Sequence, residues 1–176
     1  RNVSLETKWP GALQVADIMV KGTRWATLIG LYGLLVDLDG KKCGNGKCSV
    51  TYFLDRLRPL FQSTRGDRIV LAGDLNLHPN GLPRILQDLG LVDLTAMTAR
   101  DRPRLQGCKG CDLGKNCGHM WTHRNSDQPG AAVQQIDFIH ATKALAQEVN
   151  CVGGGIRDYP DAWEISDHAP VVAEFN

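Results

Sequence analysis

Three short segments of the chain place ionisable side chains next to apolar runs. Residues 73–79 (GDLNLHP) follow an apolar run, and residues 135–140 (QIDFIH) hold Asp137 inside one. Residues 166–170 (SDHAP) come just before the apolar end of the chain. A carboxylate at the end of a buried strand is costly unless it is paired, hydrogen-bonded or bound to metal. Because each segment brings an Asp, we expect the three to form a single polar site.

Apolar periodicity predicts the elements that position these segments. Strands are expected at 13–20 and 24–36 with a turn at 21–23, and a helix with one apolar stripe at 50–62. The run 68–73 is typical of a strand buried on both faces. The other elements expected are an edge segment at 1–8, loops at 37–47 and 98–116, a short helix at 83–89 closed by Gly90, strands at 133–141 and 169–175, and a helical link at 142–149. These elements predict one α/β (α+β) domain over residues 1–176.

The motifs in their order resemble those of the endonuclease/exonuclease/phosphatase superfamily. Gly73-Asp74-Leu75-Asn76 is similar to its Gly-Asp-(Phe/Leu)-Asn signature, Ile136-Asp137-Phe138-Ile139 to its Ile-Asp-(Tyr/Phe)-Ile strand, and Ser166-Asp167-His168 to its Ser-Asp-His end motif. Thr122 after Trp121, and Tyr32 at the end of a strand, also fit positions of the pattern. The resemblance implies a DNase I-like β-sandwich flanked by helices. It also implies a divalent-metal-dependent phosphoesterase that cleaves phosphodiester bonds of nucleic acid. The superfamily includes nucleases, inositol-phosphate phosphatases and sphingomyelinases.

The resemblance also implies a role for each residue. Asp74 would orient or deprotonate the attacking water, and Asn76 would donate its amide N–H to the phosphate. His168 would contact the phosphate while Asp137 holds its other ring nitrogen. Tyr32 and Thr122 would contribute to substrate binding. The metal, Mg²⁺ or Mn²⁺, would be held by Asp167 and Asp74, because hard cations prefer oxygen ligands.

Each of these residues also has an ordinary structural interpretation. Asp74 and Asn76 are residue types that form turns at strand ends. Asp137 is equally explained as the buried partner of an Arg, and His168 or Tyr32 as a core side chain. Only the order and spacing of the motifs along the chain favour the shared catalytic role.

The sequence departs from the family pattern at its beginning. Relatives carry an N-terminal strand ending in Asn and then a Gln-Glu pair whose Glu is the principal metal ligand, whereas the 31 residues before Tyr32 contain no Gln-Glu pair. Together with a first residue other than Met, this predicts an N-terminally truncated domain with weakened metal binding. We expect a homodimer or a partner chain to cover the exposed edge. The alternatives are a catalytically incomplete DNase I-like binding or interaction module, or one half of a two-part enzyme.

The six cysteines form two loop clusters and one outlier. Cys108, Cys111, Cys117 and His119 form a Cys-x2-Cys-x5-Cys-x-His array that suits a structural Zn²⁺; disulfides or free thiols are the alternatives. Cys43 and Cys48 bracket a tight loop and would form a disulfide in an oxidising compartment.

Charge and hydropathy exclude few functions. The formal net charge is +1, from 20 basic and 19 acidic residues, so no global field indicates nucleic acid or a membrane surface. No apolar run approaches the roughly 18 residues of a membrane span. No signal peptide is recognisable at the N-terminus. A soluble protein is expected, with the cytoplasm favoured, and the sequence does not choose between DNA, RNA, lipid and inositol-phosphate substrates.

Overall fold

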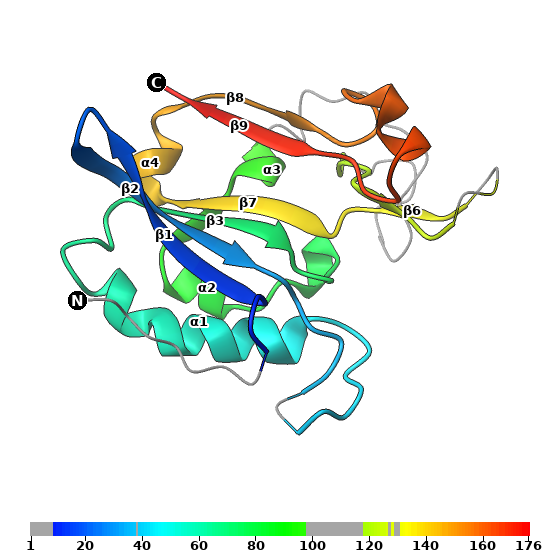
Figure 1. The fold of residues 1–176 in the computed structure, drawn as a ribbon, viewed down its shortest axis with the longest axis horizontal. Coiled ribbons are helices and arrows are strands. Elements are labelled where there is room, and N and C mark those ends of the chain that lie inside the picture. The colour runs from blue at the N-terminus through cyan, green and yellow to red at the C-terminus, as the bar shows by residue number, and fades with distance from the viewer. Residues whose placement is uncertain (1–8, 38, 98–117, 127, 129–130) are drawn as a thin grey trace.

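A five-stranded mixed sheet forms the centre of the fold (Figure 1). The computed structural model describes residues 9–37, 39–97, 118–126, 128 and 131–176. Along the chain these residues form β1 (Leu13–Val20), β2 (Thr23–Leu31), α1 (Lys47–Phe61), β3 (Ile69–Asp74), η1 (Pro79–Gly81), α2 (Ile85–Asp88), β4 (Leu91–Asp93), α3 (Leu94–Met97), β5 (His123–Arg124), β6 (Val133–Gln134), β7 (Asp137–Thr142), α4 (Lys143–Ala146), β8 (Val149–Gly154), η4 (Pro160–Glu164) and β9 (Val171–Phe175).

The strand order in the main sheet is β1-β2-β3-β7-β4. Strands β2 and β3 are parallel and are joined through α1, whereas the β1–β2, β3–β7 and β4–β7 pairs are antiparallel. Two antiparallel ribbons, β5–β6 and β8–β9, complete the strands of the described residues. This arrangement brings the ends of β2 and β3 to the edge of the sheet at which β7 begins.

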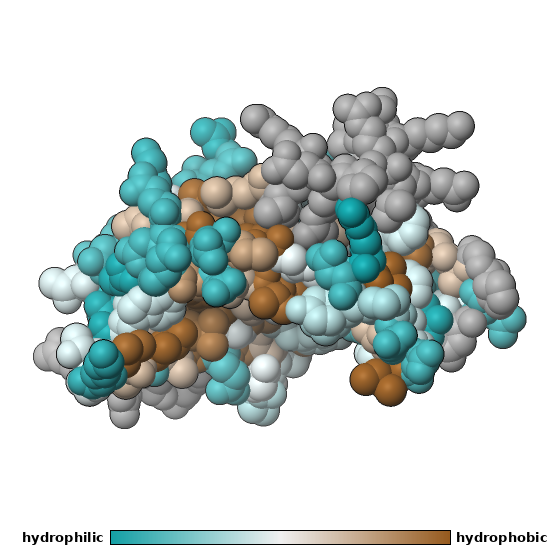
Figure 2. Space-filling model, turned by 90° about the horizontal axis from the view of Figure 1, so that it is seen from above, coloured by the Kyte–Doolittle hydropathy of each residue, from teal (hydrophilic) through white to brown (hydrophobic). Residues whose placement is uncertain are grey.

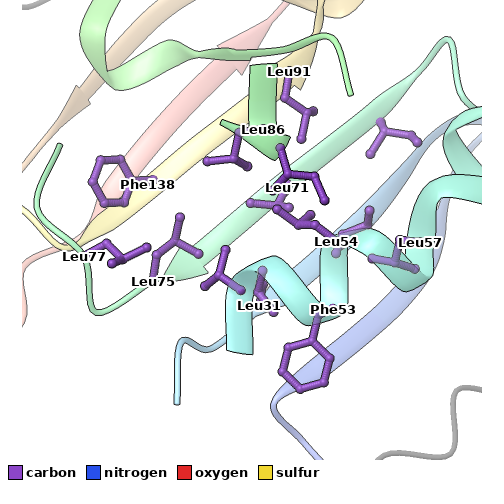
Figure 3. Packing of buried hydrophobic residues seen from close by; sticks show 14 of the residues in the cluster. Leu31, Phe53, Leu54, Leu57, Leu71, Leu75, Leu77, Leu86, Leu91 and Phe138 are labelled. Carbon is purple, nitrogen blue, oxygen red and sulfur yellow. The ribbon is translucent and has the colours of Figure 1, made fainter. Parts of the chain in front are cut away.

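The main sheet lies between two different layers (Figure 1). On one side α1 and α2 cover a core that contains Phe53, Leu54 and Leu57 of α1 (Figure 3). On the other side the β8–β9 ribbon and α4 cover a second core around Val70, Ala141 and Leu145. The expected sandwich with flanking helices is therefore confirmed. Within the described residues, no helix combines the length and apolarity needed to cross a bilayer.

Helix α1 follows the predicted apolar stripe but begins earlier, at Lys47 instead of residue 50. Its first turn is held against the rest of the fold because Ser49 bonds to the backbone of Leu34, which accepts from the hydroxyl at 3.2 Å and donates to it at 2.8 Å. Phe61, predicted on the stripe, is only partly buried at the end of the helix. Tertiary contacts thus extend the helix beyond the periodic segment.

Two predicted strands differ from the observed ones. The strand expected over 24–36 ends at Leu31, because the chain turns away and the N–H of Gly33 donates to the carbonyl of Asp74 at 2.7 Å. The strand expected over 133–141 is divided into β6 and β7, since the N–H of Ile136 bonds to the Thr122 hydroxyl. The expected segments at 1–8 and 98–116 lie outside the described residues.

Several short elements have no counterpart among the predictions. They are β4, α3, β5 and β8, together with the one-turn elements η1 and η4. The helical link expected over 142–149 shortens to α4, and the terminal strand expected from residue 169 begins at Val171. Of these segments, β4 is defined by its pairing with β7 and β8 by its pairing with β9, rather than by a local apolar period.

We predict that Gly33→Ala lowers the free energy of unfolding by more than about 2 kcal/mol. A Cβ at this position would lie 2.0 Å from the backbone carbonyl oxygen of Leu75, which has no freedom to move aside. Gly30→Ala in β2 is the matched control, because its Cβ would meet only the Gln14 side chain at 3.7 Å. Urea denaturation of both variants checks this, and equal stabilities would contradict it.

Candidate active site

Two carboxylates face each other where the central strands β3 and β7 meet at one edge of the sheet. Asp74 is the last residue of β3, Asp137 is the first residue of β7, and the two are directly opposed in the antiparallel register. Both side chains are partly buried. Like charges directly across a sheet are destabilising. The pair therefore indicates a site where charge is used for something other than folding.

Asp137 is hydrogen-bonded to His168, which comes just before β9. Nδ1 of His168 lies 3.0 and 3.2 Å from the two carboxylate oxygens of Asp137. This contact fixes the ring so that its Nε2 is left for a ligand. Asp74, Asp137 and His168 each offer a ligand atom within 4.8 Å of the others, so the structure brings together three residues from the three sequence segments.

Thr122 lies beneath this group rather than in it. Its side chain is fully buried, and its hydroxyl accepts the backbone N–H groups of Ile136 and Asp137, both at 3.2 Å. Its carbonyl accepts the N–H of Ala169 at 2.8 Å. Thr122 therefore connects the start of β7 to the segment that carries His168. It positions the hydrogen-bonded pair of Asp137 and His168, the dyad, without facing solvent.

Asn76 is held in a strained turn next to Asp74. Its backbone has φ 49°, a left-handed conformation that Asn adopts more readily than most residues. Its N–H donates to Oδ1 of Asp74 at 2.7 Å, and its side-chain amide donates to the carbonyl of Gly33 at 2.8 Å. Asp74 and Asn76 therefore do form a turn at the end of β3, as their residue types allow. One amide N–H of Asn76 remains for a ligand, since an NH₂ group carries two donors.

Asp167 and Tyr32 are the exposed members of the predicted set. The Asp167 side chain is 61% exposed, and its carboxylate lies 3.8 Å from Nε2 of His123. Tyr32 is 47% exposed and directly precedes Gly33, whose N–H donates to the Asp74 carbonyl. The charge of Asp167 thus acts on Asp74, and Tyr32 directly precedes the residue that bonds to the end of β3.

Cavities surround the site on several sides. Asp137 and His168 line a cavity of about 450 Å³ with Gly73 and Ile165. A second cavity, of about 530 Å³, is lined by Asn76 with Asn45, Lys47, His78 and Gln134 among others. A third, of about 780 Å³ and mainly polar, is lined by Asp167 and Arg124. These openings give an extended ligand room to reach the dyad.

The environment changes the acidity of Asp74. Its pKa is raised from 3.8 to about 6, chiefly because burial disfavours the charged form. The N–H of Asn76 opposes this rise, and the charge of Asp137 adds to it. Asp74 is therefore an ionised carboxylate at neutral pH whose pKa lies close to the range in which a general base works.

The sequence did not single out His123 or its neighbour Gln134. The His123 ring packs edge-on against His168, with centroids 4.7 Å apart, and the two residues form an isolated antiparallel bridge. Nε2 of Gln134 lies 2.8 Å from Nδ1 of His123. One sequence signal could have identified His123: it directly follows Thr122, which the motif pattern had already singled out. In the structure this segment runs beside the Ser-Asp-His motif.

Neither cysteine cluster is part of the described active site. Cys108, Cys111 and Cys117 lie outside the described residues, so the predicted zinc array stays a prediction; His119, its fourth member, has a pKa lowered by burial. Cys43 and Cys48 are free thiols with Sγ atoms 2.9 Å apart. The hydrogen bond between them raises the pKa of Cys43 to about 11, so this thiol is not an activated nucleophile.

We predict that Asp74→Asn stabilises the metal-free protein at high pH but not at low pH. The folded-state pKa of about 6 lies above the ordinary 3.8, so the ionised carboxylate destabilises the folded state. The contribution of the protonated carboxyl to folding stability is complete below about pH 3.8 and is lost as the pH rises through 6. Asn carries no charge and avoids this loss. Urea midpoints in EDTA at about pH 8 and about pH 4 measure this difference. Asp39→Asn, in an exposed loop, is the control and is expected to show no such pH dependence. An Asp74→Asn protein less stable than the unsubstituted protein at the higher pH would contradict the prediction.

Comparison with known proteins gives matches among solved structures only. No family model and no curated protein sequence matches the chain. The endonuclease domain of TRAS1, a telomere-specific non-LTR retrotransposon, aligns with TM-score 0.60 and 13% identity, covering 94% of this chain and 64% of that one. An AP endonuclease from Archaeoglobus fulgidus aligns with TM-score 0.58 and 19% identity, covering 93% and 65%. A 3'-5' exonuclease from Neisseria meningitidis aligns with TM-score 0.53 and 21% identity, covering 92% and 64%.

This chain thus spans less than two thirds of each of these structures while nearly all of it aligns with them. The aligned architecture is the sheet, helix and ribbon arrangement that places the opposed carboxylates and the His168 dyad at one edge. The chain therefore has the DNase I-like fold that these structures share.

Proposed function

We propose that this chain carries the hydrolytic centre of a divalent-metal-dependent phosphodiesterase that acts on nucleic acid. The observation that carries the proposal is the Asp137–His168 dyad, 3.0 Å between Nδ1 and Oδ2, with Asp74 beside it. The similar structures include endonucleases and an exonuclease, which supports nucleic acid as the substrate class. Room for a polymer is supported by the cavity lined by Asp137 and His168 and by the polar cavity lined by the adjacent Asp167.

In this proposal each residue handles one part of phosphodiester hydrolysis. Asp74 accepts a proton from the attacking water, a role that its pKa of about 6 suits. His168, fixed by Asp137, donates from Nε2 to a phosphoryl oxygen, and the remaining amide N–H of Asn76 donates to another. Tyr32 contacts the phosphate from the exposed side, and Thr122 acts only through Asp137.

The carboxylates of Asp74 and Asp167 would hold Mg²⁺ or Mn²⁺. Carboxylate oxygens suit such an ion, because hard cations take oxygen ligands, and the charges of Asp137 and Asp167 both add to the negative potential at Asp74. When bound, the ion would neutralise charge on the phosphoryl group and on the leaving oxygen. With two carboxylates of the described residues as ligands, we expect the ion to be weakly held.

We predict that Asp137→Asn and His168→Gln each lower phosphodiesterase activity by about 10²–10⁴-fold, and that the double variant loses little more, because the two residues act as one unit. Cleavage of plasmid DNA and of a chromogenic phosphodiester with Mg²⁺ or Mn²⁺ measures this. EDTA and Asp74→Ala should abolish turnover, whereas Asp39→Asn should leave it unchanged.

Turnover that survives in both Asp74→Ala and His168→Ala would contradict the proposal. A folded protein with no turnover on any phosphoester would favour the alternative, a DNase I-like binding module or one half of a two-part enzyme.

We also propose that a second copy of this chain or a partner polypeptide covers the β1 side of the molecule. β1 is the last strand in the sheet order, and most of its side chains are exposed. Val15, Met19 and Val20 are 39%, 57% and 50% exposed. Figure 2 views a different face, from above the β8–β9 ribbon, where apolar side chains also lie between polar ones. An unpaired edge with apolar neighbours is a ready surface for association.

We predict that the chain self-associates at micromolar concentration and that Met19→Lys shifts it toward monomer. A charge on an exposed strand edge blocks pairing with another edge. Light scattering coupled to size-exclusion chromatography measures the mass. Lys21→Met, in the turn after β1, is the comparison variant that leaves the strand face intact. A stable monomer at every concentration would contradict self-association.

A further inference from the structure

Two histidines and one aspartate form a second ligand group at the edge of the proposed catalytic centre. His123, Asp167 and His168 each offer one ligand atom, and these atoms all lie within 4.8 Å of one another. His123 has no role in the hydrolysis proposed above. We propose that this group binds a borderline transition-metal ion, represented by Zn²⁺, and that the bound ion inhibits hydrolysis. The inhibition rests on the proposed function, whereas the binding does not.

The backbone holds the two histidines opposite each other before any ion binds. His123 and His168 form an antiparallel bridge between two segments distant in sequence. Backbone hydrogen bonds hold this contact on both sides. The N–H of Arg124 donates to the Asp167 carbonyl at 3.0 Å, and the N–H of Ala169 donates to the Thr122 carbonyl at 2.8 Å. The His168 N–H also donates to the Ser166 hydroxyl at 3.0 Å. A metal site on such a fixed frame needs little reorganisation.

Each histidine has a partner on Nδ1, which directs its Nε2 to the ion. Metal-bound histidines usually donate their other ring N–H to a carboxylate or a carbonyl. Nδ1 of His168 faces Asp137 at 3.0 Å, and Nδ1 of His123 faces the Gln134 side-chain amide at 2.8 Å. In the structure the amide nitrogen of Gln134 faces Nδ1 of His123 and donates to Oδ1 of Asn125, so an ion on Nε2 of His123 requires this amide to turn over and accept the Nδ1 proton. Both histidines then present an unprotonated Nε2.

Asp167, the third ligand, lies close to His123, and its exposed side chain can rotate to complete the site. The Asp167 carboxylate lies 3.8 Å from Nε2 of His123. Neighbouring ligands of a tetrahedral zinc with bonds of about 2.0–2.1 Å lie about 3.3 Å apart. Asp167 is 61% exposed, so a small side-chain rotation brings it to that separation. Three protein ligands leave a fourth position open to water.

The ligand types distinguish this group from the carboxylate site proposed for Mg²⁺. Imidazole nitrogens suit Zn²⁺, whereas carboxylates and water suit Mg²⁺. Zn²⁺ bound here occupies Nε2 of His168, the atom proposed to donate to the phosphate, and it also occupies the Asp167 carboxylate. Binding of Zn²⁺ and productive contact with the phosphate are therefore mutually exclusive.

Metal titration of the whole chain tests the site without requiring activity. Zn²⁺ affinity is measured by calorimetry in excess Mg²⁺, and Co²⁺ is used as an absorbing probe. In Cys43→Ser/Cys48→Ser protein we expect one equivalent of Zn²⁺ to depend on His123, and we expect the part of the visible Co²⁺ spectrum that His123→Gln removes to lack a thiolate charge-transfer band. His123→Gln and Asp167→Asn should each weaken this binding by at least about tenfold. His119→Gln is the matched control, because it removes a histidine of the cysteine array and should leave this site unchanged.

Imidazole nitrogen NMR gives a second readout. Addition of Zn²⁺ should shift Nε2 of His123 and of His168 together, and it should do so in protein whose thermal unfolding shows a normal fold. Zn²⁺ should inhibit phosphodiester cleavage, each rate being normalised to that of the same variant without Zn²⁺. His123→Gln should raise the inhibitory Zn²⁺ concentration at least about tenfold, in step with its lower affinity.

The outcomes separate the two proposals. Unchanged Zn²⁺ affinity in folded His123→Gln and Asp167→Asn, or binding lost only in His119→Gln, would overturn the metal site. Binding with these ligands in a protein without hydrolytic activity would support the metal site and count against the phosphodiesterase. Binding with no inhibition of an active enzyme would overturn the regulatory part of the inference.

Discussion

The opposition of Asp74 and Asp137 across two central strands is the constraint on which the site depends. The antiparallel register of β3 and β7 fixes these acids directly opposite one another at the edge of the sheet. Such a pair is unfavourable for folding alone, and burial raises the pKa of Asp74 to about 6. The remaining polar contacts offset this cost, since His168 satisfies Asp137 and the Asn76 N–H satisfies Asp74.

The two cores keep that register from slipping. A shift by one residue would turn every side chain of β3 to the opposite face, but Leu71 packs in the α1 core while Val70 packs under the β8–β9 ribbon. At the far end of the sheet, Arg68 makes two hydrogen bonds to Glu148, at 2.6 and 2.8 Å, and donates to the carbonyl of Trp25. The precision of the site is therefore set by packing on both faces of one sheet.

Sequence reasoning reached the parts of this arrangement that leave a local pattern. The apolar stripe around Leu54 and the run at 68–73 led to α1 and β3, and the three motifs led to Asp74, Asp137 and His168. It did not reach β4 or β8, which are defined by pairing with distant strands. It also missed His123, because its contact with His168 depends on a bridge between separate segments. The sequence predicted Thr122 at the substrate, and in the structure its buried hydroxyl accepts two backbone N–H groups at the start of β7.

His168 belongs to both ligand groups, one with Asp74 and Asp137 and the other with His123 and Asp167. The metal that binds would therefore decide what His168 can do. Asp137 on Nδ1 prepares Nε2 of His168 equally well for a phosphoryl oxygen or for a metal ion. What decides between them is the neighbour of His168: Asp74 adds a hard oxygen ligand, and His123 adds a borderline nitrogen ligand. In these proposals Mg²⁺ would bind on the Asp74 side of His168 and Zn²⁺ on the His123 side, so the two ions would occupy different positions. In our proposal His123, next to Thr122, would then set how this site responds to metals.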